Sequence, residues 1–336
     1  MTADKTLDVF ALGNALVDLQ VEVDDDFLGR LEVEKGHMLL VDADRQAAVV
    51  DALADSDHVV HRSSGGSAAN TVAGLAQLGS SAAFCGRVAD DELGRFYRQD
   101  LQDQGAAVHG QLTGSRTGTS AVLITPDAQR TMMTFLGAAV ELSPEDVSAE
   151  AVATARWLYL EGYLLTGEST LAACHAAIEA ARAAGTRVSL TASDPFVCNV
   201  ARETLDELLS GKVDLLFCNE IEAEALTGES DPEAAGVKLA ERCAEVVVTR
   251  SDKGSVLVRE KNEVTHVAPV PTTAVDTTGA GDSFAAGFLH GLASNRSWAD
   301  AGRIASGLAS RVVSRLGARL PEAPSSADVE GWLAQS

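Results

Sequence analysis

Short apolar runs alternate with alanine-rich amphipathic stretches along most of this chain. The apolar runs are rich in β-branched and aromatic residues and are too short for helices, so they predict buried strands. Strands that alternate with helices predict a doubly wound, mostly parallel α/β sheet flanked by helices. The predicted strands are residues 9–12, 157–160, 188–191, 213–218 and 246–249.

Candidate binding residues come directly after these strands. Asn14 and Asp18 follow the first strand, Phe196 follows 188–191, Asn219 follows 213–218 and Ser251 follows 246–249. Doubly wound sheets bind ligands beyond the carboxyl ends of their strands. We therefore expect these side chains to lie around one site.

Two segments, residues 19–41 and 108–136, alternate apolar and polar positions without long helices between them. This pattern predicts a small β-sheet lid. No long polar or Pro/Gly/Ser-rich stretch divides the chain, so residues 1–336 are expected to form one domain. A lid would exclude water from a site that handles a reactive group.

Composition narrows the range of partners. The 336 residues are 46% hydrophobic and carry 49 acidic against 26 basic side chains, a net charge of −23. Nucleic acid would be repelled, whereas a nucleotide needs only local positive potential. No basic leader and no apolar run of membrane-spanning length occurs, so no membrane partner and a cytoplasmic location are expected. A monomer and a homodimer both stay open.

Cysteine and histidine spacings give no metal or disulfide signal. The five cysteines lack C-x-x-C spacing and are expected to be buried apolar residues. The histidines show no H-E-x-x-H spacing, and none is assigned a role. The cysteines are at positions 85, 174, 198, 218 and 243.

The strongest chemical signal is the run D-T-T-G-A-G-D-S-F at residues 276–284. Apolar residues after it share one helical face, so a helix is expected to begin near Gly281. Unpaired amides at a helix start bind anions, and glycine permits both a positive φ and a close approach. The amides of Gly279, Ala280 and Gly281 are the predicted anion hole.

Asp282 would lie beside that anion, where a carboxylate is repulsive unless it has a function. The function we predict is general base, accepting a proton from a substrate hydroxyl that attacks a γ-phosphorus. The alternative is that Asp282 caps its helix. Three rival motifs are incomplete. Residues 74–79 lack the lysine of a P-loop, and residues 65–69 lack the last glycine of a nucleophile elbow, which disfavours a serine hydrolase. No G-x-G-x-x-G follows the first strand, so a dinucleotide dehydrogenase has little support.

The run at 276–284 resembles the C-terminal signature of the ribokinase-like (PfkB) carbohydrate and nucleoside kinase family. G-G-S-A-A-N at 65–70 and N-E-I-E at 219–222 resemble two further elements of the family, in the expected order. The resemblance implies a ribokinase-like fold and an ATP-dependent kinase that uses Mg²⁺. It also implies that Asn219 and Glu222 order Mg²⁺ and the phosphates through water.

The resemblance extends to the phosphate acceptor. It implies that Asp18 grips two adjacent hydroxyls, with Asn14 and Leu16 in the same segment. It places Gly65, Gly66 and Asn70 against the same sugar. A carboxylate can accept two hydrogen bonds from a cis-diol, which suits ribose.

Three segments look like those of adenosine-kinase-like members: residues 13–18, 130–137 and 193–196. They favour transfer to the 5′-hydroxyl of a ribonucleoside, a purine nucleoside such as adenosine. The alternatives are a sugar kinase acting on ribose or fructose and a non-catalytic nucleoside sensor. Phe196 would stack on the base, and Met38, Leu16 and Phe135 would line the lid side of the base; the alternative for each of these is a plain core residue. Arg130 would neutralise the transferring phosphate, and the alternative for it is a solvated surface arginine.

On the donor side, residues 249–254 resemble the nucleotide loop T-x-G-x-x-G of the family. Thr249 and Gly254 are present, and Ser251 replaces the first glycine. The segment around Gly317 resembles the loop that covers adenine. The resemblance also implies that backbone oxygens near Asp276 and Thr278 hold a monovalent cation, so K⁺ dependence is expected.

Overall fold

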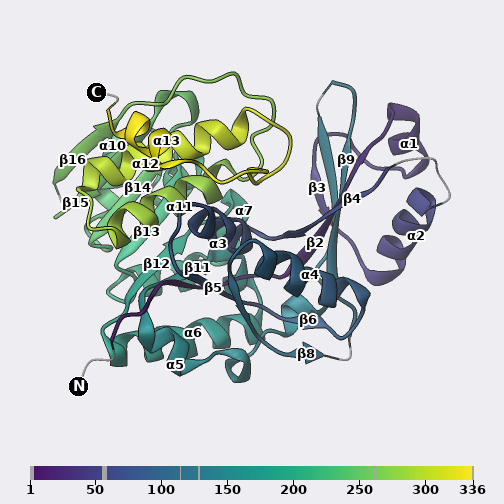
Figure 1. Ribbon diagram of the computed structural model, residues 1–336, viewed down its shortest axis with the longest axis horizontal. Coiled ribbons are helices and arrows are strands. Elements are labelled where there is room, and N and C mark those ends of the chain that lie inside the picture. Colours follow the sequence, from purple (N-terminus) through teal and green to yellow (C-terminus); the bar gives the residue numbers. More distant parts are fainter. Residues whose placement is uncertain (1–3, 55–58, 114, 128, 261, 335–336) are drawn as a thin grey trace.

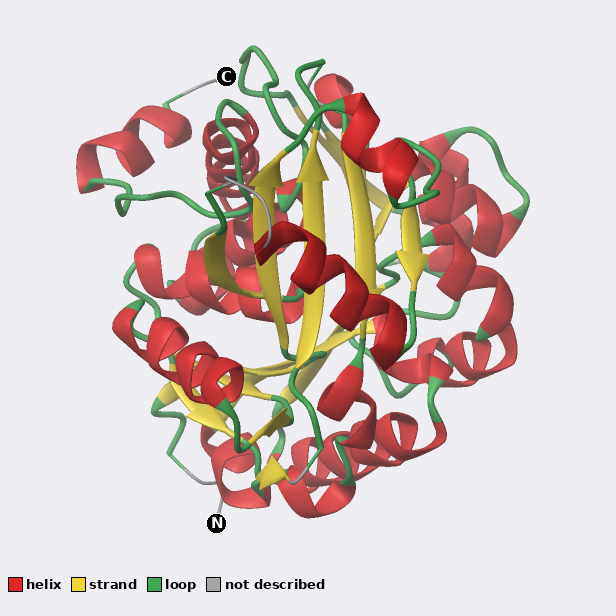
Figure 2. Cartoon of the chain, turned by 90° about the vertical axis from the view of Figure 1, so that its right-hand side faces the viewer, coloured by secondary structure: helices red, strands yellow, loops and turns green. Residues whose placement is uncertain are grey.

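In the computed structural model, which describes residues 4–54, 59–113, 115–127, 129–260 and 262–334, a nine-stranded sheet has helices on both faces (Figures 1 and 2). Its order is β16-β15-β14-β13-β12-β11-β1-β5-β7, and neighbouring strands are parallel except that β15 is antiparallel to both β14 and β16. The fold class and all five predicted strands are confirmed. The strands are β1 Leu7–Leu12, β5 Ala82–Cys85, β7 Ala107–His109, β11 Ala155–Glu161, β12 Arg187–Thr191, β13 Leu215–Asn219, β14 Glu245–Thr249, β15 Ser255–Arg259 and β16 Glu263–Val267.

Alternate residues of the strands feed two separate cores, as a sheet covered on both faces requires. In β1, Val9 belongs to the core shared with α3, α11 and α12, whereas Phe10 belongs to the core shared with α5, α6 and α8 to α10. The helices on the first side are α3 Ser67–Gln77, α4 Glu92–Asp103, α11 Ala280–Ala293, α12 Trp298–Val313 and α13 Ser326–Leu333. Those on the second are α5 Ala149–Thr154, α6 Glu168–Ala184, α7 Pro195–Val200, α8 Arg202–Leu209, α9 Glu220–Thr227 and α10 Pro232–Leu239.

A five-stranded sheet, called the small sheet below, stands beside the large one (Figure 1). Its order is β3-β10-β9-β2-β4, and α1 (Asp25–Arg30) and α2 (Ala43–Ala54) pack on a third core against it. The segments expected to form a lid contribute four of its strands, β2, β3, β9 and β10. The fifth strand, β4, lies outside those segments, and β7 belongs to the large sheet. The strands are β2 Leu16–Glu22, β3 Met38–Leu40, β4 His61–Gly65, β9 Gly118–Ile124 and β10 Arg130–Phe135, with β6 Val88–Ala89 and β8 Leu112–Thr113 forming a separate pair.

All five cysteines are buried, as the sequence predicts, and each is a free thiol. Among the described residues, no helix combines the length and the apolar character needed to cross a membrane.

Candidate active site

Asp282 lies where two helices begin. Helix α11 starts at Ala280, directly after Gly279, which has a left-handed φ of 74°. Two side chains from the first turn of α3 donate to the Asp282 carboxylate: Ser67 Oγ to Oδ1 at 2.6 Å and Asn70 Nδ2 to Oδ2 at 2.9 Å. Two motifs more than 200 positions apart in sequence therefore meet at one carboxylate.

Asp282 is not the capping residue of its helix, because the N-cap is Gly279 and no side chain caps it. Burial raises the pKa of the Asp282 carboxyl, and the bonds from Ser67 and Asn70 and the charge of Arg319 lower it in part. A carboxylate with a raised pKa is a stronger proton acceptor than a free aspartate. The position suits a general base better than a structural cap.

The glycine turn, residues 279–281, packs closely against the Ala318 backbone at Gly279 and is open at Gly281. A Cβ on Gly279 would lie 2.6 Å from the carbonyl oxygen of Ala318. A Cβ on Gly281 would meet nothing within 4 Å. The Ala280 amide donates to the Thr277 carbonyl at 3.2 Å, so its predicted role toward an anion competes with this bond.

Asp18 lies on β2 of the small sheet, against the backbone of β4. A Cβ on Gly65 would lie 2.3 Å from Asp18 Oδ2, so only glycine leaves room for the carboxylate there. Burial raises the pKa of Asp18 to about 6, against the charges of Arg319 and Arg130, and nearby Asp282 raises it further. Asp18 and Asp282 are thus electrostatically coupled.

Asn14 and the start of α3 are both fixed by Glu161, a residue that the sequence did not single out. The backbone amide and Nδ2 of Asn14 donate to Glu161 Oε1 at 2.6 and 2.8 Å, and the Ala68 amide donates to Oε2 at 3.0 Å. Glu161 is 1% exposed, and burial raises its pKa to about 7. The Asn14 amide group is therefore directed at Glu161. Gly66, with φ 97°, packs against the Asn14 carbonyl.

The face of the small sheet that carries Asp18 also carries apolar side chains. Asp18 pairs with Ser120, Ser120 with Thr134, and Thr134 with Leu40, so these residues share one face. Met38, two positions before Leu40, lies on it too, and the two are 44% and 59% exposed. Leu16 also belongs to this face and contacts Gly118, and Phe135 lines a hollow of about 300 Å³ with Leu40, Thr134 and Val140.

Arg130 connects the small sheet to the glycine turn. Its guanidinium contacts the Asp276 carboxylate and the Thr278 hydroxyl. The Asp276 carboxylate is buried and also accepts from the amides of Thr278 at 3.0 Å and Gly317 at 2.6 Å. The side chains of Asp276 and Thr278 therefore already contact a cationic group, which leaves the backbone oxygens near them as the expected ligands of a monovalent cation.

Asn219 and Glu222 form a capping box at the start of α9. Asn219 Oδ1 accepts from the amides of Ile221 and Glu222, while Glu222 accepts from the Asn219 amide and from Nδ2. Glu222 is buried, which raises its pKa to about 7. Ordering of Mg²⁺ by this pair would use the lone pairs that the box leaves free.

The nucleotide loop follows β14, where Thr249 Oγ1 donates to the Cys218 carbonyl at 3.4 Å. Ser251, the residue at the first glycine position of the motif, has φ 52°, in the left-handed region. Gly254 has φ 81° and ψ −140°, and its Cβ would lie 2.1 Å from the Val267 carbonyl. The serine thus adopts the conformation for which glycine is suited.

Replacing Ser251 by glycine is expected to stabilise the protein by about 0.5–1 kcal/mol, because the left-handed conformation costs a residue with a Cβ about 1–2 kcal/mol and glycine loses part of that gain as chain entropy. Urea unfolding would measure the change. Ser251→Ala removes the same hydroxyl without relieving the backbone, and equal stabilisation by both variants would contradict this explanation.

Phe196 lies at the same end of the large sheet as the site, and Arg319 contacts the site directly. Phe196 lies in the first turn of α7, next to the carboxyl end of β12, and is 59% exposed. Arg319 donates through Nε to Asn70 Oδ1 at 2.9 Å. Neither Arg319 nor Glu161 was predicted from the sequence as a site residue. The one local feature that could have indicated Glu161 is its position as a carboxylate at the end of an apolar strand.

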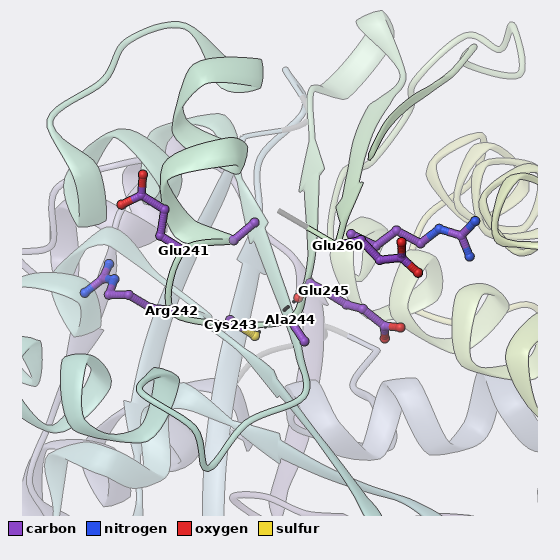
Figure 3. Close-up of a pocket in the computed structure, with 8 residues that line it drawn as sticks. Glu241, Arg242, Cys243, Ala244, Glu245 and Glu260 are labelled. Atoms are coloured by element: carbon purple, nitrogen blue, oxygen red, sulfur yellow. Dashed lines mark hydrogen bonds between the residues drawn. The ribbon is translucent and has the colours of Figure 1, made fainter. Parts of the chain in front are cut away.

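The hollow in Figure 3 is not part of this site. It has a volume of about 360 Å³ and lies where β14 begins, at Glu245, and β15 ends, at Arg259. The candidate site lies at the other end of β14, beyond Thr249. Among the described residues, no group of three or more His, Cys, Asp or Glu side chains is arranged to hold a metal ion.

The fold and this site define a phosphotransferase that acts on an alcohol group. The Asp282 carboxylate, a glycine turn at a helix start and the Asp18 carboxylate lie together beyond the strand ends. Residues 38–325 match the family model described as pfkB family carbohydrate kinase, and the chain belongs to this family. Members of the family generally use ATP and Mg²⁺.

Known proteins similar to this chain include nucleoside and sugar kinases. The adenosine kinase structure from Sinorhizobium meliloti is 38% identical, with a TM-score of 0.87 over 97% of this chain and 99% of that one. A structure named "probable sugar kinase protein", from Rhizobium etli CFN 42, is 36% identical, with a TM-score of 0.89 over 99% and 100%. A fructokinase from Klebsiella pneumoniae is 32% identical over 74% of this chain and 83% of its own length.

Proposed function

We propose that the chain transfers the γ-phosphoryl group of Mg·ATP to the 5′-hydroxyl of a ribonucleoside, a purine nucleoside such as adenosine. The observation that carries the kinase chemistry is the Asp282 carboxylate, fixed by Ser67 and Asn70 at the start of α11. The nucleoside assignment is supported by the exposed Met38 and Leu40 on the sheet face that carries Asp18, and by similarity to an adenosine kinase over 97% of the chain.

In this proposal, Asp18 and Asn70 align the acceptor and Asp282 accepts the proton of its 5′-hydroxyl. The hydroxyl oxygen forms a bond to the γ-phosphorus as the bond to the β–γ bridging oxygen breaks, and ADP leaves. Amides of the glycine turn and the Arg130 guanidinium would stabilise charge on the transferring group. Asn219 and Glu222 would order the Mg²⁺ that arrives with ATP, and Thr249, Gly254 and the loop around Gly317 would contact the nucleotide.

A kinase of free sugars is the second candidate, because the fructokinase is 32% identical. The structure named as a probable sugar kinase is similar over 99% of this chain, so the choice of acceptor rests on the assay below. A non-catalytic nucleoside sensor would not need a base in hydrogen-bond contact with two acceptor-side residues.

The test is coupled ADP release with Mg·ATP, measured against adenosine, inosine, guanosine, cytidine, ribose and fructose. Turnover confined to nucleosides supports the proposal. Turnover with ribose or fructose alone would replace the acceptor assignment and keep the kinase chemistry. No turnover above the acceptor-free rate, together with tight nucleoside binding by calorimetry, would favour the sensor.

The same assay in KCl and in NaCl tests the monovalent cation proposed near Asp276 and Thr278. We expect faster turnover in K⁺. Equal rates in both salts would argue that the Arg130 guanidinium supplies the positive charge at this place.

Phe196→Ala is expected to raise KM for the preferred nucleoside by about 5–100-fold, because stacking of a base on an aromatic ring contributes about 1–3 kcal/mol. Turnover of ribose, where measurable, should not change. Val200 lies on the same short helix and is 56% exposed, so Val200→Ala is the matched control. Equal effects of the two variants, or none with Phe196→Ala, would remove Phe196 from the base-binding surface.

A further inference from the structure

Four consecutive residues, Gly317 to Leu320, connect the glycine turn to helix α3. The Gly317 amide donates to Asp276 at 2.6 Å, and Ala318 packs against Gly279 so closely that a Cβ there would clash. Gln77, at the end of α3, donates through Nε2 to the Leu320 carbonyl at 2.7 Å. The segment therefore touches the phosphate side and the acceptor helix within four residues.

Between these anchors, the Arg319 guanidinium lies in the acceptor region. Its Nε donates to Asn70 Oδ1 at 2.9 Å and its Nη1 to Ser64 Oγ at 2.8 Å, and Asp100 Oδ2 is 3.8 Å from Nη1. The side chain is 11% exposed, and Nη2 is buried without a partner among the described residues. A buried, partly unpaired guanidinium is costly unless it has a function.

The bond from Arg319 determines which way the Asn70 amide faces. A guanidinium has donors and no acceptor, so the amide must turn its oxygen toward Arg319. The Asn70 NH₂ group is then left to face Asp282, to which it donates at 2.9 Å. Reversing the amide would put its oxygen against the carboxylate, which is repulsive.

We propose that Arg319 is a positioning residue that fixes the orientation of the Asn70 amide and thereby the orientation of the base, Asp282. It also ties this alignment to the segment that packs on the glycine turn, so the donor and acceptor sides are aligned by one structural unit. The proposal concerns the catalytic role of this network and rests on the proposed kinase function.

The charges around Arg319 agree with this role. Asp18 on β2, Asp282 on α11 and Asp100 on α4 all interact with its positive charge, and Tyr97 on α4, whose pKa burial raises well above its usual value, faces it as a neutral phenol. That charge lowers the pKa of Asp18 and of Asp282, against the effect of burial and of their mutual repulsion. Arg130 on β10 is a second cation that acts on Asp18. Without Arg319, two carboxylates would share the region with less compensation.

The test compares Arg319→Met, Arg319→Lys and Gln77→Met in ADP-release kinetics with the preferred acceptor. Arg319→Met is expected to lower kcat by about 10–100-fold, since misplacing a catalytic group by about 1 Å costs up to 10²-fold, with KM for ATP nearly unchanged. Arg319→Lys keeps a donor-only cation and should recover most of the loss. Gln77→Met removes the other side-chain anchor of the segment and should stay within about threefold of wild type.

The acidic limb of the kcat/KM profile should also move to higher pH in Arg319→Met, because the carboxylates lose a compensating charge. Equal losses in Arg319→Met and Gln77→Met, or no recovery with lysine, would mean that Arg319 only holds the segment in place. If wild type turns over no acceptor, the proposed function fails instead. The side-chain amide resonances of Asn70, assigned with Asn70→Ser, then decide: unchanged resonances in Arg319→Met would overturn the proposal.

Discussion

Replacing Asp282 by asparagine is expected to lower kcat by at least about 10²–10⁴-fold, the range typical of general base catalysis. The amide has nearly the same shape as the carboxylate but cannot accept the hydroxyl proton. Ser67 and Asn70 both donate to the Asp282 carboxylate. The NH₂ group of an asparagine at this position would therefore face one of these two donors and lose that hydrogen bond. ADP release in the presence of acceptor measures the loss.

Two controls separate the base from its surroundings. Acceptor binding by calorimetry should change much less than kcat, since Asp18, which we propose holds the diol, is unchanged in this variant. Wild-type activity should fall as the pH drops through the raised pKa of Asp282, because the protonated acid no longer accepts a proton. Near-normal turnover in Asp282→Asn, or an unchanged acidic limb in that variant, would rule out Asp282 as the base.

The large sheet could be predicted because its strands are short apolar runs separated by alanine-rich helices. Such runs are buried on both faces, so their sequence pattern is strong. The start of α11 was predictable for a similar reason, since glycines precede an apolar helical face. Strand β4 was missed because H-R-S-S-G is polar and alternates weakly, yet it carries Gly65 to the Asp18 carboxylate.

Much of the candidate site could not be predicted because its contacts join distant parts of the chain. Arg319 and Asn70 are 249 positions apart, and nothing near Arg319 in the sequence separates it from a surface arginine. Glu161 ends an apolar strand, and its importance comes from the two backbone amides that it accepts. Asn219 and Glu222 show the opposite case, because their spacing is explained by a capping box as well as by Mg²⁺.

Gly279→Ala is expected to destabilise the protein by about 2–4 kcal/mol and to lower kcat by about 10²-fold or more. The residue has φ 74°, which disfavours a Cβ, and the new Cβ would lie 2.6 Å from the Ala318 carbonyl oxygen and 2.8 Å from the Ala318 Cα. The glycine turn and the 317–320 segment would have to separate, and Arg319 moves with that segment. Urea unfolding and ADP release measure the two effects.

Gly281→Ala provides the contrasting case two residues further on. Among the described residues, its Cβ would meet no atom within 4 Å apart from its chain neighbours and its own helix backbone, and alanine is favoured over glycine in a helix by about 1 kcal/mol, so stability should rise. If the open side of the turn receives a phosphate, kcat/KM for ATP should nevertheless fall, because the methyl group occupies the approach to the amides. A Gly281→Ala variant that is more stable and fully active would show that the phosphate binds elsewhere. The glycine at 279 would then be explained by its left-handed backbone conformation alone.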